Sequence, residues 1–289
     1  MQGLFLLQLR AQSYPQHSRH LPWNLLDQGG FTPLGLTLLQ ELAKRGAHII
    51  ALSPEPISSP RVDIIIELLR STTSNQNIFA EHCDLSSPVS IREFCSRFLT
   101  TEENRLDGIV FAHEYAHIGS PLSTKSTPLE DEMERQTRSL ATFLITTLLL
   151  PILLVAPIER DIRIVNVINP FYAAAVTNFS PTTEIPEKPS IFLQEGRRSL
   201  QVAILTRHLQ RILDSMPQSS QAPKVDNEVV NVVNSKLQRS NVVAVAVSPG
   251  ITKTDTIAPL LAATRESPSR FAFTGLILLV LHLPLLEMC

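Results

Sequence analysis

The chain has 289 residues, of which 44% are hydrophobic and 18% charged, and its 25 basic and 27 acidic side chains give a formal net charge of −2. This balance leaves no surplus of Lys and Arg for binding a nucleic acid, so no nucleic-acid partner is expected. The apolar content supports an ordered core and excludes a largely disordered chain. Three scattered cysteines, Cys83, Cys95 and Cys289, form no disulfide framework and are typical of a reducing, intracellular compartment.

The first 23 residues are predicted to be weakly ordered. Residues 3–9 are apolar but too few to span a bilayer, and polar sequence containing His and Pro follows them. No basic stretch precedes this apolar run, and no small-residue cleavage site follows it, so the pattern does not match a secretory signal. We therefore expect the folded domain to begin near residue 24.

From residue 24 onward, short apolar runs rich in β-forming residues alternate with amphipathic helical patterns. The first strand is weak, because residues 22–27 (PWNLLD) are a poor substitute for an apolar run. The first helix places four leucines on one face and ends before Gly46, as a helix commonly does. Further strands are predicted over 47–52, 77–83, 106–112, 162–168 and 242–247, and helices over 34–45, 62–71, 89–99, 130–150 and 200–216.

This alternation predicts βαβ units and an α/β fold, a doubly wound parallel sheet with helices on both faces. The nearly continuous apolar strands agree, because parallel strands are covered on both faces. The predicted domain covers residues 24–260, with a polar surface insertion over 217–240. In such sheets ligands bind at the carboxyl ends of the strands, so any site is expected there.

Two uncharged stretches raise the question of a membrane. Residues 139–158 are long enough to span one, but strand and helix signals flank them and Thr and Pro interrupt them, so we expect a helix packed on the sheet, which could also form a subunit contact in a homo-oligomer. Residues 271–286 are shorter and contain His282 and Pro284. This apolar segment, within 261–289, leaves two readings open: a membrane-associated helix or a buried C-terminal helix. The expected location is the cytoplasm or the endoplasmic-reticulum membrane.

The order of motifs resembles the short-chain dehydrogenase/reductase family, in particular its retinol-dehydrogenase-like branch and related fungal proteins. The resemblance extends over about residues 28–256. It implies a Rossmann-type fold, NAD or NADP as cofactor, and an oxidoreductase acting on a small lipophilic alcohol or ketone. It is carried by GAHII (46–50), Asp84-Leu85, LDGIV (106–110), FLITTLLLP (143–151), RIVNV (163–167), ILTRHLQ (204–210) and SPGIT (248–252).

The resemblance also implies which residues would bind the cofactor. The family's glycine-rich turn corresponds to residues 28–35, in which Pro33 replaces the middle glycine and removes an amide donor. The Asp84 carboxylate would meet the adenine amino group. Ser53 and Pro54 stand where the family often selects NAD or NADP, and they favour neither. The implied cofactor-binding residues are Gly29, Gly30, Gly35, Asp84, Leu85, Ala112, Pro249, Gly250 and Thr252.

The family's catalytic Asn, Ser, Tyr and Lys correspond here to Arg138, Asn169, Glu195 and Ser199, and no Tyr-x-x-x-Lys pair occurs between residues 169 and 206. Glu195 and Asn169 would be substitute groups in a divergent reductase, since a carboxyl group can act in acid–base catalysis when its pKa is shifted. The neighbouring arginines at 197 and 198 are interpreted as a solvated pair, which leaves Glu195 without a tuning cation. The alternative is a non-catalytic relative, a pseudoenzyme, that binds a nucleotide or a partner.

A competing motif is His113-Glu114-Tyr115-Ala116-His117, which matches the H-E-x-x-H pattern of zinc hydrolases. That pattern requires a helix to place both imidazoles on one face. Here a predicted strand precedes it and Gly119 follows it. A zinc hydrolase is therefore only a remote alternative, and no metal site is assigned.

Overall fold

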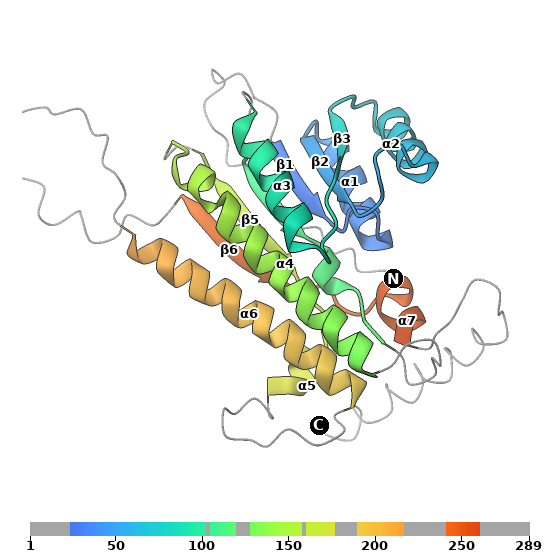
Figure 1. The fold of residues 1–289 in the computed structure, drawn as a ribbon, viewed down its shortest axis with the longest axis vertical. Helices are drawn as coiled ribbons and strands as arrows, with labels where there is room; N and C mark the ends of the chain where they lie inside the picture. The colour runs from blue at the N-terminus through green and yellow to red at the C-terminus, as the bar shows by residue number, and fades with distance from the viewer. Residues whose placement is uncertain are drawn as a thin grey trace, which may run out of the picture.

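The computed structural model describes residues 24–101, 105–119, 128–157, 160–176, 190–216 and 241–260. They form a six-stranded parallel sheet in the order β3-β2-β1-β4-β5-β6, with helices on both faces (Figure 1). This confirms the predicted doubly wound α/β fold. The predictions for residues 1–23, the insertion at 217–240 and the apolar segment at 261–289 lie outside the described residues.

The sheet has its turning point between β1 and β4, which lie next to each other although two strands separate them along the chain. Leu26 of β1 pairs with Ile50 of β2 on one side and with Ile109 of β4 on the other. Because the strand order reverses here, a crevice is expected at the carboxyl ends of these two strands. The strands are β1 Asn24–Gln28, β2 His48–Ser53, β3 Ile78–His82, β4 Gly108–Phe111, β5 Ile162–Val167 and β6 Val242–Val247.

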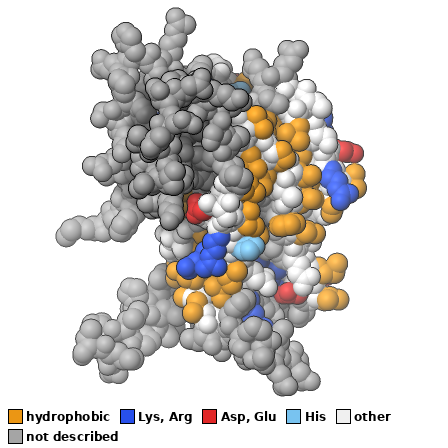
Figure 2. All heavy atoms as spheres, turned by 90° about the vertical axis from the view of Figure 1, so that its left-hand side faces the viewer, with side chains coloured by type: hydrophobic (Ala, Val, Ile, Leu, Met, Phe, Trp, Pro, Cys, Tyr) orange, Lys and Arg blue, Asp and Glu red, His pale blue; other side chains and the backbone are white. Residues whose placement is uncertain are grey.

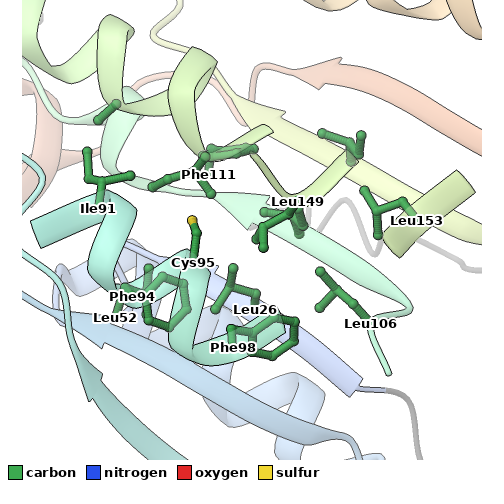
Figure 3. Packing of buried hydrophobic residues seen from close by; sticks show 14 of the residues in the cluster. Leu26, Leu52, Ile91, Phe94, Cys95, Phe98, Leu106, Phe111, Leu149 and Leu153 are labelled. Atoms are coloured by element: carbon green, nitrogen blue, oxygen red, sulfur yellow. The ribbon is translucent and has the colours of Figure 1, made fainter. Parts of the chain in front are cut away.

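The helices divide between the two faces of the sheet. Helices α1 (Pro33–Lys44) and α2 (Pro60–Thr73) bury one apolar cluster against β1–β3. Helices α3 (Pro88–Thr100), α4 (Pro128–Leu154) and α6 (Ile191–Ser215) bury the larger cluster on the opposite face (Figures 1 and 3). Shorter helical segments are η1 His113–Tyr115, α5 Tyr172–Val176, η3 Lys253–Ile257 and α7 Ala258–Leu260.

The first strand forms fully, although its sequence is weak. Leu25 packs in the cluster under α1, while Leu26 packs in the cluster under α3 and α4. The next residue, Asp27, is completely buried, and its carboxyl oxygens have no hydrogen-bond partner among the described residues. An acidic side chain in this position explains why β1 is hard to recognise from the sequence.

Two helix boundaries differ from the sequence prediction. Helix α4 continues through Pro151 to Leu154 instead of ending before the proline. The proline removes only the hydrogen bond to the carbonyl of Thr147, an exposed residue one turn earlier. Helix α6 begins at Ile191, well before the predicted start, because Ser190 caps it by accepting a hydrogen bond of 3.3 Å from the Leu193 amide.

Helix α4 is long and apolar enough over Leu129–Leu154 to cross a membrane by length and composition alone. Its buried face, with Ile145, Leu149 and Leu153, packs on the sheet, which confirms the predicted sheet-packed helix. Leu140 and Phe143 remain exposed on α4, and Figure 2 shows hydrophobic side chains exposed on one face of the molecule. A subunit contact through this helix stays a prediction.

Candidate functional site

A cleft with a volume of about 520 Å³ opens at the carboxyl ends of β1–β4. This is the size of many small-molecule sites. Its walls come from the turns that follow the four strands and from the first half of α4. The lining residues are Gly29, Phe31, Thr32, Leu52, Ser53, Pro54, Glu55, Arg61, Val62, Cys83, Asp84, Leu85, Ser86, His113, Met133, Glu134, Thr137 and Arg138.

Two glycines near the turn after β1 lie so close to neighbouring backbone atoms that a side chain would not fit. Gly29 has φ of +89°, and a Cβ there would lie 2.4 Å from the backbone nitrogen of His113. A Cβ on Gly35 would lie 2.0 Å from the carbonyl oxygen of Gly29. The turn thus packs directly against both the β4 turn and the first turn of α1, so both glycines have a purely structural reason to be present.

The N-terminus of α1 faces this turn and uses its amides within the chain. Thr32 caps the helix, and its hydroxyl accepts a hydrogen bond of 3.1 Å from the Gly35 amide. Pro33 has no N–H group. Burial raises the pKa of Asp255 in the nearby η3 turn, and hydrogen bonding with Thr254, the Leu34 backbone and Thr252 opposes that rise.

The far end of the cleft, beyond β2 and β3, carries charges of both signs. Glu55 pairs with Arg61 at 2.9 Å, and its amide donates to the Ser53 hydroxyl at 3.0 Å. Asp84 Oδ1 accepts a hydrogen bond of 2.9 Å from the Ser86 amide. A carboxylate here would favour the ribose hydroxyl of NAD, and an arginine would favour the 2′-phosphate of NADP. Because both are present side by side, the cleft itself does not distinguish NAD from NADP.

The structure brings only part of the predicted cofactor set to the cleft. Gly29, Asp84 and Leu85 line it, as does Arg138 from the predicted catalytic set. The other residues of the cofactor set do not line it: Gly30, Gly35, Ala112, Pro249, Gly250 and Thr252. Residues that the sequence did not single out, such as Arg61 of α2 and Thr137 of α4, reach the cleft only through the folding of distant elements.

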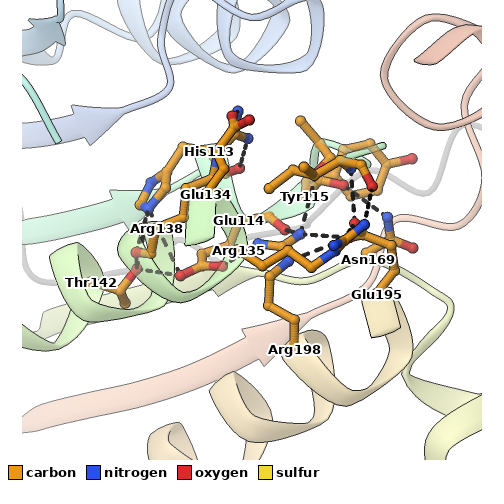
Figure 4. Close-up of polar contacts among 12 residues, drawn as sticks. His113, Glu114, Tyr115, Glu134, Arg135, Arg138, Thr142, Asn169, Glu195 and Arg198 are labelled. Atoms are coloured by element: carbon orange, nitrogen blue, oxygen red, sulfur yellow. Dashed lines mark hydrogen bonds and ion pairs between the residues drawn. The ribbon is translucent and has the colours of Figure 1, made fainter. Parts of the chain in front are cut away.

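The predicted catalytic glutamate belongs to a buried network of two carboxylates and two guanidinium groups (Figure 4). Arg135 Nε lies 2.9 Å from Oε1 of Glu195, and Arg198 lies 3.3 Å from the other oxygen. Arg198 also pairs with Glu114 at 2.5 Å. All four side chains are at most 3% exposed. The interpretation of Arg198 as a solvated surface residue is therefore wrong, as is the expectation that Glu195 lacks a neighbouring cation.

Asn169 and Ser199 of the predicted catalytic set also lie away from the cleft. Asn169 donates to the Tyr115 carbonyl at 3.2 Å and accepts from the Phe171 amide at 3.0 Å. Ser199 is buried, and its hydroxyl has no hydrogen-bond partner in the part of the chain that the structure describes. Neither residue lines the cleft.

The fully buried side chain of Tyr115 in η1 holds the segment after β6 in place. Its hydroxyl donates to the Gly250 carbonyl at 2.8 Å and accepts from the Thr252 amide at 3.0 Å and from the Thr256 hydroxyl at 2.9 Å. These three bonds hold residues 250–256 against η1. They explain why Gly250 and Thr252 lie away from the cleft.

The H-E-x-x-H residues do not form a metal site. His113–Tyr115 is a single 3₁₀ turn rather than an α-helix. His113 Nε2 lies 3.2 Å from the Thr142 hydroxyl, whereas His117 stacks edge-on against Phe171. Burial lowers the pKa of His113 to about 4. Within the described residues, no group of three His, Cys, Asp or Glu side chains could hold a metal ion.

The cleft fits the adenosine portion of a dinucleotide better than the remainder. Asp84 and Leu85, which the family resemblance assigns to the adenine, line the cleft. His113 also lines it, and its buried Nδ1 has no partner among the described residues. An orphaned ring nitrogen of this kind suits a hydrogen bond to a ligand. At the phosphate end, in contrast, Pro33 has no N–H and the Gly35 amide already donates to the Thr32 hydroxyl.

Comparison with known proteins gives relatives but no match to a family model. The uncharacterized oxidoreductase pbr1 of Schizosaccharomyces pombe is 32% identical over 139 residues, covering 47% of this chain and 36% of the relative. Human retinol dehydrogenase 13 is 25% identical over 229 residues, covering 78% and 58%. The chain therefore spans between about a third and three fifths of the length of these relatives.

Solved structures share the fold. A short-chain dehydrogenase from Sphingobium yanoikuyae in complex with NADPH superposes with a TM-score of 0.57 at 17% identity, covering 89% of this chain and 85% of that one. Together with the sequence relatives, this confirms the resemblance to short-chain dehydrogenases/reductases that the motif order predicts.

Proposed function

Starting from a chain that is like the short-chain dehydrogenases/reductases in sequence and fold, we propose that it binds the adenosine half of NAD or NADP in the cleft without carrying out the family's reduction chemistry. The observation that carries this proposal is the contrast between the two regions. The cleft at the turning point of the sheet is open and lined by Gly29, Asp84 and Leu85, whereas Glu195 and Ser199, at the family's proton-transfer positions, are buried and do not line it.

Reduction by this family's chemistry would need a proton donor that the substrate can reach. A general acid must come within hydrogen-bond reach of the atom that it protonates. Glu195 is fully buried, and its two oxygens are occupied by Arg135, Arg198 and the Ile118 amide.

The relatives favour a second candidate. Several carry names of oxidoreductases, and one solved relative of the fold is described as a bulky-bulky ketone specific alcohol dehydrogenase. A reductase of a lipophilic alcohol or ketone would use the same cleft for its cofactor. It would need a proton donor other than the buried Glu195.

One pair of measurements separates the candidates. Calorimetric titration of the full chain with NADPH and NADH should detect binding, and NADPH consumption with a panel of lipophilic ketones should equal the rate without protein. Absence of binding by either dinucleotide and by adenosine at millimolar concentration would overturn the proposal. Ketone-dependent consumption of NADPH would establish the reductase instead.

A further inference from the structure

His113, in the turn after β4, lines the cleft with a ring whose two nitrogens have different surroundings. Nε2 lies 3.2 Å from the Thr142 hydroxyl and 3.4 Å from the Arg138 carbonyl oxygen, both on α4 (Figure 4). Thr142 does not line the cleft, so Nε2 is used inside the protein. Nδ1 is buried and has no partner in the part of the chain that the structure describes, which leaves it for a ligand in the cleft.

The contacts of Nε2 decide which ring nitrogen carries the proton. The Thr142 hydroxyl has one proton, and it donates this proton to Oε1 of Glu114 at 2.5 Å. The Arg138 carbonyl can only accept, so it also needs a donor at Nε2. Burial lowers the pKa of His113 to about 4, so the ring is neutral near pH 7 and holds a single proton. With that proton on Nε2, Nδ1 is an acceptor.

The partner of Thr142 is fixed in turn by the buried charge network. Oε2 of Glu114 accepts a hydrogen bond of 2.5 Å from Arg198, and the Glu114 carbonyl accepts another of 2.6 Å from the same guanidinium group. Glu114, Thr142 and Arg198 are all buried. The bond that one ring nitrogen makes sets the state of the other. Contacts deep in the protein therefore hold His113 with a bare nitrogen left for the cleft.

The distance between His113 and Asp84 indicates which part of an adenosine would meet this nitrogen. Asp84 follows β3 and His113 follows β4, and β2 and β1 lie between these strands. Neighbouring strands are about 4.8 Å apart, so the two strand ends are separated by about 14 Å. Adenosine carries its amino group at one end and its ribose at the other. With the amino group at Asp84, as the family resemblance implies, the ribose lies on the side of His113.

Building on the proposed function, we propose that His113 is a specificity-determining residue whose Nδ1 accepts a hydrogen bond from a ribose hydroxyl of the bound adenosine. A hydroxyl supplies the proton that this nitrogen lacks, whereas an ionised phosphate oxygen does not. Because Nδ1 is buried, a ligand without the hydroxyl leaves it unpaired, and that is costly. The cleft therefore selects nucleosides with a complete ribose over their deoxy analogues.

The test measures the binding of adenosine, 2′-deoxyadenosine and 3′-deoxyadenosine to full-length proteins by calorimetry. The wild type should bind one of the two deoxy compounds about tenfold more weakly than adenosine. In His113→Gln the amide nitrogen can still donate to Thr142, but no acceptor remains at the position of Nδ1, so this preference should disappear. His113→Asn places its carbonyl oxygen near that position and should retain most of the preference. His208→Gln, at an exposed histidine of α6, is the matched control and should behave as the wild type.

Nitrogen NMR of the histidine rings tests the same assignment without a substitution. In the free wild type, Nδ1 of His113 should have the resonance of an unprotonated ring nitrogen. Saturating adenosine should shift that resonance to lower frequency, as a hydrogen-bond donor does, and 2′-deoxyadenosine or 3′-deoxyadenosine should fail to do so. A protonated Nδ1 in the free protein would overturn the proposed role.

The other outcomes are also distinguishable. If adenosine binds, but the wild type does not prefer it over either deoxy compound or His113→Gln keeps the preference, the role of His113 is overturned while the proposed function stands. Purine riboside lacks the amino group, and if His113→Gln loses the preference for adenosine over this compound instead, Nδ1 meets the adenine and the assignment to the ribose is wrong. If adenosine binds none of the proteins, both proposals are overturned.

Discussion

Arg135 of α4 donates a hydrogen bond of 2.9 Å from Nε to Oε1 of Glu195 on α6, and neither side chain reaches solvent. Arg198 and Glu114 complete the set, so two positive and two negative charges balance within the protein. Such a network is costly to desolvate, and its charges depend on one another. Glu195, which stands at the family's proton-transfer position, therefore links helix α6 to helix α4.

Replacing Glu195 by Gln should destabilise the protein by about 3 kcal/mol, because it removes the nearer and buried of the two carboxylates that pair with Arg135 and leaves only the more exposed Glu132 at 3.6 Å. Urea unfolding followed by circular dichroism measures the change. Glu67→Gln, at an exposed carboxylate paired with Arg70, is the matched control and should have little effect. A Glu195→Gln protein as stable as this control would show that the network contributes nothing as a unit.

Asp27 should make stability depend on pH. Burial raises the pKa of Asp27 from 3.8 to about 8. Between these values the folded protein binds a proton that the unfolded chain has released, so the free energy of unfolding falls as pH rises from about 4 to about 8, by up to ~1.4 kcal/mol per unit. Asp27→Val suits a strand and carries no charge. It should remove this slope and raise stability at pH 8.

The measurement is urea unfolding of both proteins at several pH values from 5 to 8.5. Other titrating groups are common to both proteins, so the difference between the two curves isolates Asp27. Parallel curves for the wild type and Asp27→Val would mean that the carboxyl group is ionised in the folded state.

Tyr115→Phe should loosen the segment after β6. The substitution removes one hydroxyl that bonds the Gly250 carbonyl, the Thr252 amide and the Thr256 hydroxyl, and the buried groups left behind cost about 2 kcal/mol. Hydrogen exchange of the Thr252 amide should accelerate. Tyr172→Phe, at a partly exposed tyrosine of α5, should leave that amide as protected as in the wild type.

Gly35→Ala tests the close approach beneath the cleft. The new Cβ would meet the Gly29 carbonyl oxygen at 2.0 Å, so backbone must move, at a cost of about 3 kcal/mol. Gly46→Ala is the comparison, because no atom lies within 4 Å of its Cβ position and only its φ of +79° opposes the change, at about 1 kcal/mol. Thermal melting of both variants would detect the difference, and equal melting temperatures would contradict it.

The sequence predicts the fold better than the site because the fold depends on local patterns. The apolar run at residues 242–247 predicts β6 with its exact bounds. The sequence signal fails at β1, where Asp27 interrupts the apolar pattern. It fails again at Pro151, which was expected to end α4. The helix continues to Leu154 because the proline removes only one backbone hydrogen bond, to an exposed residue.

The candidate site could be predicted only where its residues follow strands directly. Asp84 follows β3 and lines the cleft as expected. The pairing of Arg198 with Glu114, 84 residues earlier, has no local signal, since an arginine on a polar helix looks solvated until the tertiary structure encloses it.

The four-charge network also has a consequence for the order of assembly. Glu114 follows β4, while Arg135 and Arg198 come from two helices later in the chain, so no short piece of the protein can complete it. A half-built network would bury charges without partners, which makes it a late event, formed after the main folding barrier. Its loss should therefore speed spontaneous opening while the rate of folding stays the same, so these side chains lengthen the lifetime of the native state.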